Sequence, residues 1–414
     1  MAEQKTPREQ FAVERLSNQL IANGYQVEMA ADASDSKNAQ IILQLVERDT
    51  TQLSKNTPSA LPGEGYALES KGQDILLTAT GTSGILYGCL YLADHVKETG
   101  KLPENLHLTD QPEMVMRGTC VGLQKTTYLP GRDVYEYPYT PETFPWFYDK
   151  ELWIKYLDMM VENRYNSLYL WNGHPFASLV KLHDYPYAVE VDDATFEKNK
   201  EMFSFLTSEA DKRGIWVIQM FYNIIVSKPF AEHNKLKTQE RSRPIVPVIS
   251  DYTRKSIAAF IENYPNVGLL VTLGEAMNTI DDDVDWFTQT IIPGVQDGLK
   301  ALDSEHEPPI VLRGHDTDAE QVMHAALPIY KNLYTMFKYN GESLTTYKPR
   351  DSWSSIPAAL SKLGSVHISN VHILANLEPF RYGSPDFIRK SVEAMHTAQG
   401  ANGVHVYPQA SYWD

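Results

Sequence analysis

The sequence predicts an α/β fold, a (β/α)8 TIM barrel preceded by a small α+β domain. After Pro112 the chain contains eight apolar runs of strand length, most of them separated by stretches with helical character. The run that ends at Leu273 is apolar throughout, which is typical of parallel strands buried on both faces. Eight strands that alternate with helices favour a closed barrel. A length of 414 residues fits one such barrel plus one small domain.

The first 110 residues are predicted to form the small α+β domain. Its strand candidates lie at residues 40–46, 65–70 and 75–79. Residues 85–92 follow as a helix that packs on this sheet. Gly81 and Gly84 could cradle a phosphate, but a tight strand-to-helix turn explains them better.

Residues 111–414 are predicted to form the barrel. Its strand candidates lie at residues 116–121, 167–171, 216–221, 267–273, 310–313, 334–338, 372–376 and 404–407. The helical stretches between them include residues 151–161, 203–212, 254–263 and 387–398. The chain stops at Asp414, just past the eighth strand, where a barrel needs another helix. We therefore expect a C-terminal continuation of the same protein.

The composition excludes several classes of protein. A formal net charge of −16 argues against nucleic-acid binding through a broad basic surface. Cys89 and Cys120 have no zinc-binding spacing, although one disulfide between them is possible. No apolar run is long enough to span a membrane, and the polar start shows no signal peptide. We expect a periplasmic or secreted protein from which the signal peptide has been removed.

Polar and aromatic side chains gather where the predicted strands end. The carboxyl ends of barrel strands meet on one face, so residues far apart in sequence are expected to face one pit. The residues at these ends are Trp171, Asn172, His174, Asn223, Glu275, Arg313, His315, Lys338, Tyr339, Asn340, Glu342, Glu378 and Arg381. This combination of acids, amides, cations and aromatic rings is typical of a sugar-binding site.

Cleavage of a glycosidic bond needs two carboxyl groups. One protonates the leaving oxygen, and the other acts as nucleophile or activates water. Glu275, directly after the fourth barrel strand, is the predicted acid; Glu342 and Glu378 compete for the second role. Arg313 and Lys338 either pair with these acids or clamp a substrate carboxylate.

Each assignment has a plain structural alternative. Glu275 could stabilise a helix N-terminus, and Glu342 could be an exposed acid in the turn after Gly341. Glu378 could pair with Arg381, and His315 could be an ordinary loop residue. Residues 281–283 are three aspartates that could bind a metal, but a helix start or a solvated loop explains them better. No cofactor and no metal is predicted.

The chain resembles known glycoside hydrolases in three places. A small α+β domain before a barrel is similar to enzymes with a hexosaminidase-type N-terminal domain. The run from Lys338 to Glu342, Glu275 at the end of the fourth strand, and residues 214–217 and 227–229 are similar to the xylan α-glucuronidases. The acid after Asn-Gly comes sooner here, and the first-strand loop is longer and more aromatic. These departures identify the chain with a sister group, the α-galacturonidases of gut bacteria that trim the pectin rhamnogalacturonan II.

This resemblance implies an exo-acting enzyme that removes a terminal α-linked galacturonic acid from an anionic pectin oligosaccharide. Glu275 and Glu342 would form the catalytic pair. Three alternatives stay open: an α-glucuronidase acting on xylan, a hexosaminidase-like enzyme that uses substrate assistance, and a carbohydrate-binding barrel without catalysis. The second usually has Asp-Glu at the fourth strand, whereas Gly274 precedes Glu275 here.

Overall fold

The computed structural model describes residues 5–30, 38–46, 63–123, 129–130, 137–221, 224–274, 276–277, 279–341, 346–371 and 384–406. The chain divides into two compact units. Unit 1 contains residues 1–115, 156–166 and 209–215, and unit 2 contains the remainder. The predicted domain boundary near residue 110 stays a prediction.

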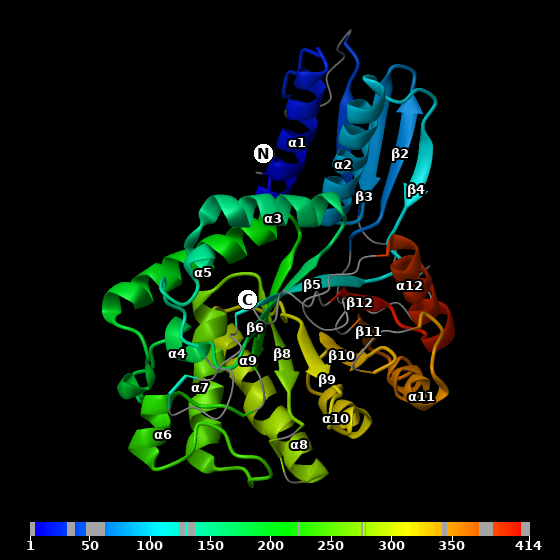
Figure 1. The fold of residues 1–414 in the computed structure, drawn as a ribbon. Helices are drawn as coiled ribbons and strands as arrows, with labels where there is room; N and C mark the ends of the chain where they lie inside the picture. Colours follow the sequence, from blue (N-terminus) through cyan, green and yellow to red (C-terminus); the bar gives the residue numbers. More distant parts are fainter. Residues whose placement is uncertain are drawn as a thin grey trace. The chain divides into compact units, whose positions relative to one another are not determined.

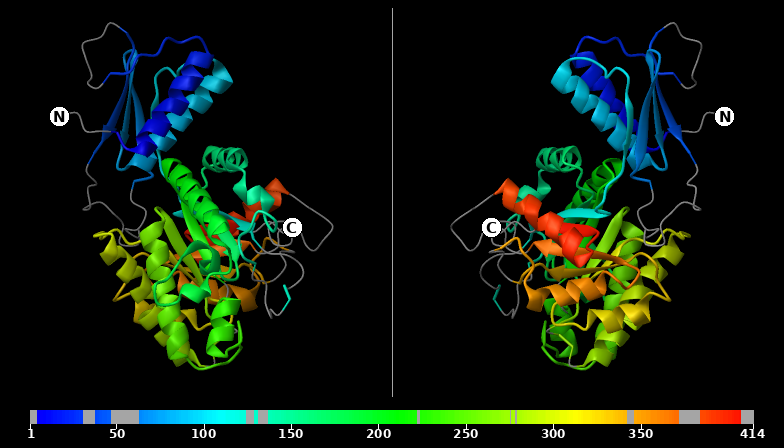
Figure 2. Two further views of the ribbon diagram at one scale, coloured as in Figure 1. Left: turned by 90° about the vertical axis from the view of Figure 1, so that its left-hand side faces the viewer. Right: turned by 90° about the vertical axis from the view of Figure 1, so that its right-hand side faces the viewer.

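Unit 1 contains a four-stranded mixed sheet in the order β1-β3-β2-β4. Its strands are β1 (Ile41–Leu45), β2 (Tyr66–Lys71), β3 (Asp74–Ala79) and β4 (His107–Asp110). Only β1 and β3 pair in parallel. Helices α1 (Pro7–Ala22) and α2 (Thr82–Thr99) lie on one face of this sheet (Figure 2). The three predicted strands and the helix at residues 85–92 are confirmed, whereas α1 and β4 were not predicted.

The glycines before α2 serve close packing rather than a ligand. Gly81 is the N-cap of α2. A Cβ atom at Gly84 would lie 2.3 Å from the carbonyl oxygen of Gly65, and the Gly84 N–H donates to the Gly63 carbonyl oxygen at 2.6 Å. Only a residue without a side chain fits this strand-to-helix turn.

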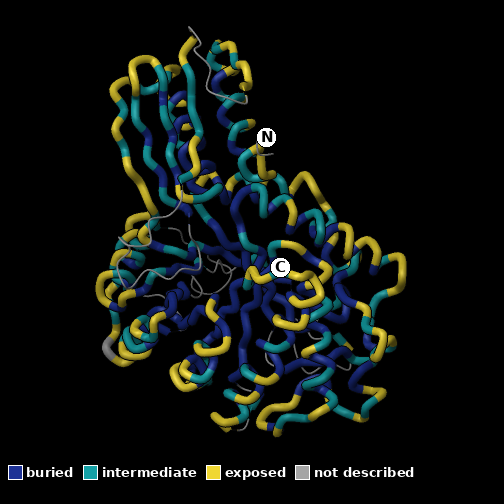
Figure 3. Tube along the Cα trace, turned by 180° about the vertical axis from the view of Figure 1, so that it is seen from behind, coloured by how far each residue is buried: buried dark blue, intermediate teal, exposed yellow. Residues whose placement is uncertain are grey.

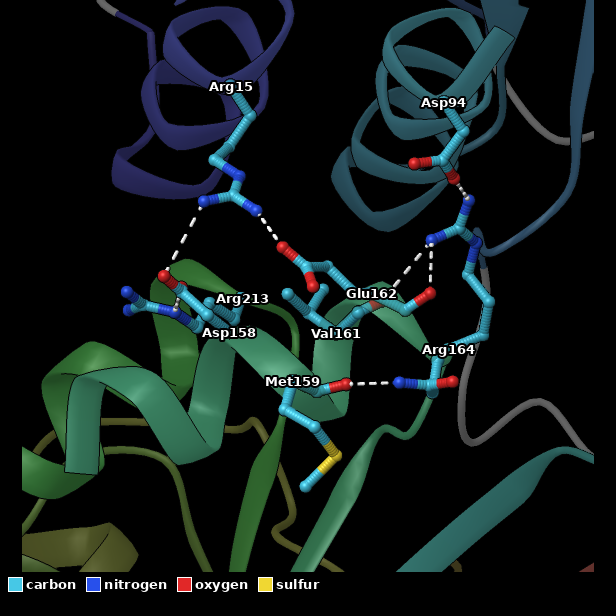
Figure 4. A network of polar contacts seen from close by, with 9 residues as sticks. Arg15, Asp94, Asp158, Met159, Val161, Glu162, Arg164 and Arg213 are labelled. Atoms are coloured by element: carbon cyan, nitrogen blue, oxygen red, sulfur yellow. Dashed lines mark hydrogen bonds and ion pairs between the residues drawn. The ribbon is translucent and has the colours of Figure 1, made fainter. Parts of the chain in front are cut away.

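A network of ion pairs joins the segments of unit 1 (Figure 4). Arg15 of α1 pairs with Glu162 and lies 3.5 Å from Asp158. Arg213, only 4% exposed, donates from Nε to Asp158 at 2.7 Å and from Nη1 to the Glu209 carboxylate at 2.8 Å. Its guanidinium also lies over the ring of Phe11, 4.6 Å from the centroid. This buried cation is therefore fully compensated by charge and by packing.

Unit 2 is built on a closed barrel of eight parallel strands (Figure 1). They are β5 (Met116–Gly122), β6 (Ser167–Asn172), β7 (Trp216–Phe221), β8 (Val267–Thr272), β9 (Ile310–Arg313), β10 (Leu333–Lys338), β11 (Val366–Val371) and β12 (Gly403–Val406). Each strand pairs with its neighbours in sequence, and β12 pairs with β5 to close the barrel. The predicted fold class is confirmed.

Helices cover the outside of the barrel, and buried residues follow its strands (Figure 3). The helices are α3 (Lys150–Glu162), α4 (Phe176–Leu179), α5 (Asp193–Lys212), α6 (Lys228–Asn234), α7 (Pro247–Asn263), α8 (Ile280–Trp286), α9 (Ile292–Ala301), α10 (Ala319–Ala326), α11 (Asp351–Leu360) and α12 (Pro385–Gln399). Two 3₁₀ turns (Pro145–Tyr148 and Pro186–Ala188) and a π-helical stretch (Phe287–Ile291) complete the list. The four predicted helical stretches correspond to α3, α5, α7 and α12.

Seven of the eight predicted barrel strands are confirmed, and one is wrong. The seventh strand was expected at residues 372–376, but β11 occupies Val366–Val371, and residues 372–383 lie outside the described part of the chain. The sequence pattern did not indicate this strand, because the polar residues His367, Ser369 and Asn370 interrupt the apolar run. All three are buried and bonded, for example His367 Nδ1 to Thr335 Oγ1 at 2.9 Å.

Much of the aromatic segment after β5 forms core packing. Tyr139, Phe144 and Phe147 are fully buried, and Trp153 is 3% exposed. Their rings contact one another, as in the 5.1 Å centroid distance between Tyr139 and Phe147. These rings therefore stabilise the fold of unit 2. Cys89 and Cys120 are both buried, and no disulfide joins them.

Replacing Arg213 with Met should destabilise the protein by about 2–3 kcal/mol, the range for hydrogen bonds to charged groups. The physical reason is that Asp158 and Glu209 lose a buried partner. The matched control is Arg389→Met, because Arg389 pairs with Asp386 and Glu393 on the surface of α12 with its side chain 57% exposed. We expect the control to change stability much less, because solvent screens exposed ion pairs. Chemical denaturation checks both values, and equal losses would contradict the assignment.

Candidate active site

The barrel brings together side chains from strands that are not neighbours. Arg313 is the last residue of β9, and Trp171 is the last but one of β6; β7 and β8 lie between these strands. The guanidinium carbon of Arg313 nevertheless lies 5.2 Å from the centre of the Trp171 ring. Their contact therefore crosses the barrel interior at the carboxyl ends of the strands, where sites of this fold lie.

Arg313 is a buried cation. It is 5% exposed and makes a cation–π contact with Trp171. Within the described residues it makes no hydrogen bond and no ion pair. An aromatic face offsets only part of the free energy lost when a guanidinium leaves water. A carboxylate that arrives with a ligand would supply the missing compensation through paired hydrogen bonds.

A second group of polar side chains lies on the neighbouring strands. Lys338, the last residue of β10 and 6% exposed, pairs in register with Asn370 of β11. The Asn370 amide contacts His405 Nδ1 of β12 at 2.7 Å, and its Oδ1 is buried without a hydrogen-bond partner in the described structure. The His405 ring in turn lies 4.3 Å from that of Tyr169.

Asn370, His405 and Tyr169 were not predicted from the sequence. Asn370 and His405 share a register position on the adjacent strands β11 and β12, whereas Tyr169 lies on β6, with β5 between it and β12. Asn370 was missed because β11 was assigned too late in the chain.

Asn172 and His174 hold the segments after β5 and β6. The Asn172 amide donates to the carbonyl oxygens of Leu123 and Tyr137 at 3.2 and 3.0 Å, and its Oδ1 accepts from the His174 N–H at 2.9 Å. His174 Nε2 lies 2.9 Å from the Tyr252 hydroxyl of α7. Both side chains are buried and engaged with protein groups, so their predicted contact with sugar hydroxyls stays a prediction.

Tyr339 and Asn340 brace the segment that follows β10. Tyr339 is fully buried and donates its hydroxyl to the Tyr347 carbonyl oxygen at 2.6 Å; burial raises the pKa of this hydroxyl to about 12. The Asn340 amide donates to the carbonyl oxygens of Thr346 and Lys348, and its Oδ1 accepts from the Arg350 N–H at 2.9 Å. These contacts tie the two ends of a segment that contains Glu342 in sequence.

The ends of β8 and β9 approach each other closely. A Cβ atom at Gly274 would lie 2.1 Å from the carbonyl oxygen of His315 and 2.6 Å from the Cβ of Asp316. An aspartate before Glu275, as in substrate-assisted enzymes, therefore cannot fit without moving the backbone. The His315 side chain is 29% exposed and lies 3.9 Å from Asp316 Oδ2.

Five predicted site residues, Asn223, Glu275, Glu342, Glu378 and Arg381, lie outside the described residues. Their sequence neighbours are informative for one of them. Gly274 and Ala276, which flank Glu275, are both buried at the carboxyl end of β8. For Glu378, the corrected position of β11 matters, because six residues now lie between it and the end of the strand.

Residues 281–283 lie in the first turn of α8, which agrees with the predicted helix start. The Thr279 hydroxyl caps this helix by accepting from the Asp282 N–H. In the described part of the chain, no three acidic, histidine or cysteine side chains could together hold a metal ion. Over the same residues, no helix is long and apolar enough to cross a membrane.

No family model and no curated protein matches this chain. Among solved structures it is similar to a GH138 enzyme that targets the pectin rhamnogalacturonan II, with 62% sequence identity and a TM-score of 0.90. That match covers 100% of this chain and 58% of the enzyme, so the chain spans less than two thirds of its relative. The predicted resemblance to a glycoside hydrolase acting on rhamnogalacturonan II is confirmed.

More distant structures share the fold alone. A GH20 β-N-acetylhexosaminidase from Streptomyces coelicolor A3(2) is 14% identical with a TM-score of 0.57, covering 97% of this chain and 80% of its own. The chitobiase of Flavobacterium johnsoniae is 11% identical with a TM-score of 0.55, covering 98% and 61%. These matches agree with the predicted hexosaminidase-like layout of a small domain and a barrel.

Asp283 provides a test of electrostatics near the ends of β8 and β9. Its side chain is 5% exposed, and burial, followed by the charges of Asp282 and Asp318, raises its pKa to about 7. The folded protein therefore binds this proton more tightly than the unfolded chain does. The contribution to stability is fully present below about pH 4 and is lost as the pH rises to about 7.

We expect Asp283→Asn to raise the free energy of unfolding at pH 8 by roughly 2–4 kcal/mol, because a pKa shift of about three units corresponds to about 4 kcal/mol at most. At pH 4 the variant and the parent should be equally stable. Urea denaturation across this pH range measures the difference, with the exposed Asp281→Asn as control. A difference that does not depend on pH would contradict the assigned ionisation.

Proposed function

We propose that this chain belongs to the same glycoside hydrolase family as its 62% identical relative, GH138, and carries the catalytic barrel of an enzyme acting on pectin rhamnogalacturonan II. The reaction is removal of a terminal α-linked galacturonic acid from an oligosaccharide. Identity over the whole chain and a TM-score of 0.90 support the family.

The observation that carries the substrate assignment is Arg313. Arg313 is only 5% exposed at the carboxyl end of β9, and its guanidinium lies over Trp171 without a carboxylate partner among the described residues. A neutral sugar would leave this charge uncompensated. A uronic acid would place its carboxylate on the guanidinium while Trp171 keeps the cation oriented. Lys338, on the adjacent strand β10, adds a second positive charge at this end.

In this proposal Glu275 and Glu342 perform the chemistry. Glu275 gives its proton to the glycosidic oxygen as the bond to the anomeric carbon breaks. Glu342 either attacks that carbon or removes a proton from an attacking water. Carboxyl groups about 5–5.5 Å apart retain the anomeric configuration and groups roughly 6.5–9.5 Å apart invert it, so the anomer first released identifies the route.

A substrate-assisted mechanism receives no support from the geometry. That mechanism would place an aspartate before Glu275, where the approach of His315 to Gly274 leaves no room for a side chain. An α-glucuronidase is the second candidate, because the run from Lys338 to Glu342 is similar to that group and Arg313 would serve any uronic acid equally well.

Arg313→Gln should lower kcat/KM for an aryl α-galacturonide by about 100-fold, because loss of one partner of a buried charge pair costs about 2–5 kcal/mol. Activity on the matching neutral α-galactoside should change little, so the preference for the uronide should disappear. The control is Arg254→Gln, since Arg254 pairs with Asp297 with its side chain 44% exposed. An unchanged preference in Arg313→Gln would show that another group recognises the carboxylate.

Glu275→Gln and Glu342→Gln should each reduce release of galacturonic acid from rhamnogalacturonan II oligosaccharides by at least about 10³-fold, because each loses one of the two required carboxyl groups. Their thermal unfolding should match the parent, and Glu378→Gln should stay active. Near-normal turnover by either of the first two variants would refute this pair. If Glu378→Gln is inactive and Glu342→Gln is active, Glu378 is the second carboxylate.

A further inference from the structure

Arg243 is a second buried cation with unused hydrogen-bonding capacity. It lies between α6 and α7 and is 7% exposed. Its Nη2 donates to the Ile224 carbonyl oxygen at 3.3 Å, and its Nη1 is buried without a hydrogen-bond partner in the described structure. No carboxylate of the described residues forms an ion pair with it, in contrast to Arg213, which has two.

The surroundings of Arg243 disfavour its charge. Burial lowers the pKa of the Arg243 guanidinium. The charge of Glu240, a residue exposed to solvent, acts in the opposite direction and raises this pKa. Fold stability alone would favour either an exposed arginine or a paired one. A guanidinium that is held away from water with one nitrogen free is suited to bind an anion that arrives with a ligand.

The position of Arg243 links it to the same end of the barrel as Arg313. Its backbone forms a parallel bridge with Met277, which follows β8 and stands two residues after Glu275 in sequence. Ile224, its hydrogen-bond acceptor, follows β7. The guanidinium is therefore anchored between segments that leave the carboxyl ends of β7 and β8.

Another unused polar group lies in the same loop. Thr238 is 6% exposed, and its hydroxyl is buried without a hydrogen-bond partner in the described structure. Its carbonyl oxygen accepts from the Val226 N–H at 3.0 Å, which holds this loop against the segment after β7. The segment between α6 and α7 thus contains a buried hydroxyl and a buried guanidinium nitrogen that both lack a hydrogen-bond partner among the described residues.

We propose that Arg243, with Thr238, forms a second anion-binding subsite, which binds the carboxylate of a sugar residue other than the one that is cleaved. This inference rests on the proposed function, in which Arg313 binds the cleaved uronic acid. Two separate buried cations that have no carboxylate partner in the described part of the chain fit a substrate that carries two carboxylates. The preferred substrate class is an oligosaccharide in which the cleaved galacturonic acid has a second uronic acid nearby.

Binding of two simple probes to the whole chain tests the subsite independently of turnover. The probes are digalacturonic acid, with two carboxylates, and methyl α-galacturonide, with one. Calorimetry on parent and Arg243→Gln protein should show that the variant binds digalacturonic acid about 30-fold more weakly. Its affinity for methyl α-galacturonide should change less than about twofold, and Arg254→Gln should bind both probes like the parent.

Two results would overturn the proposal: unchanged affinity of Arg243→Gln for digalacturonic acid, or equal weakening of the binding of both probes. Should Arg243→Gln fail to fold, Arg243→Lys keeps the charge but not the planar fork. We expect it to weaken digalacturonic acid binding about threefold to tenfold, and an unchanged affinity would equally overturn the proposal. Thr238→Val should act in the same direction.

A failure of the proposed function would be visible separately. In that case the parent protein would bind digalacturonic acid but release no galacturonic acid from it or from rhamnogalacturonan II oligosaccharides. Loss of turnover thus tests the reaction, whereas the difference between the two probes tests Arg243.

Discussion

Closure of eight parallel strands into one barrel is the constraint on which the candidate site depends. The pairing of β12 with β5 closes the ring and sets the register of every strand. In this arrangement Arg313 of β9 contacts Trp171 of β6, and Lys338 of β10 is aligned with Asn370 of β11. No local preference of these segments would bring them together, because about 140 residues separate Trp171 from Arg313 in sequence.

Arg313 and Arg243 are buried cations that make no ion pair with a carboxylate among the described residues. The chain as a whole carries a formal charge of −16, which repels an anionic ligand at long range. Arg313 and Arg243 are removed from water, so their charges act at short range in a less polar medium, where screening by solvent and salt is weak. An acidic protein can in this way bind an acidic sugar. The same burial explains why each arginine needs an anionic partner, which Arg213 has within the protein and which the other two lack among the described residues.

Two asparagines have a role that residue type alone does not reveal. Asn172 and Asn340 stand at the ends of β6 and β10, where an amide can bind either a sugar or the backbone. Both use their amide groups on the chain: Asn172 joins the segments after β5 and β6, and Asn340 ties residues 346–350 to the end of β10. Their hydrogen bonds hold the segments that follow these strands.

The sequence by itself determined the fold class and most strands, because apolar runs such as Val267–Thr272 are a local property that burial on both faces requires. It missed β11, since His367, Ser369 and Asn370 interrupt that run, and each of them is buried with at least one hydrogen bond to a neighbouring strand or helix. It also identified Arg313 and Lys338 as candidates from their place at strand ends. Only the tertiary structure decided which polar groups are already occupied and which are free. Asn340 is fully bonded whereas Arg243, which the sequence left unnoticed, keeps an unused nitrogen. The physical reason is that hydrogen-bond satisfaction depends on partners brought from distant parts of the chain.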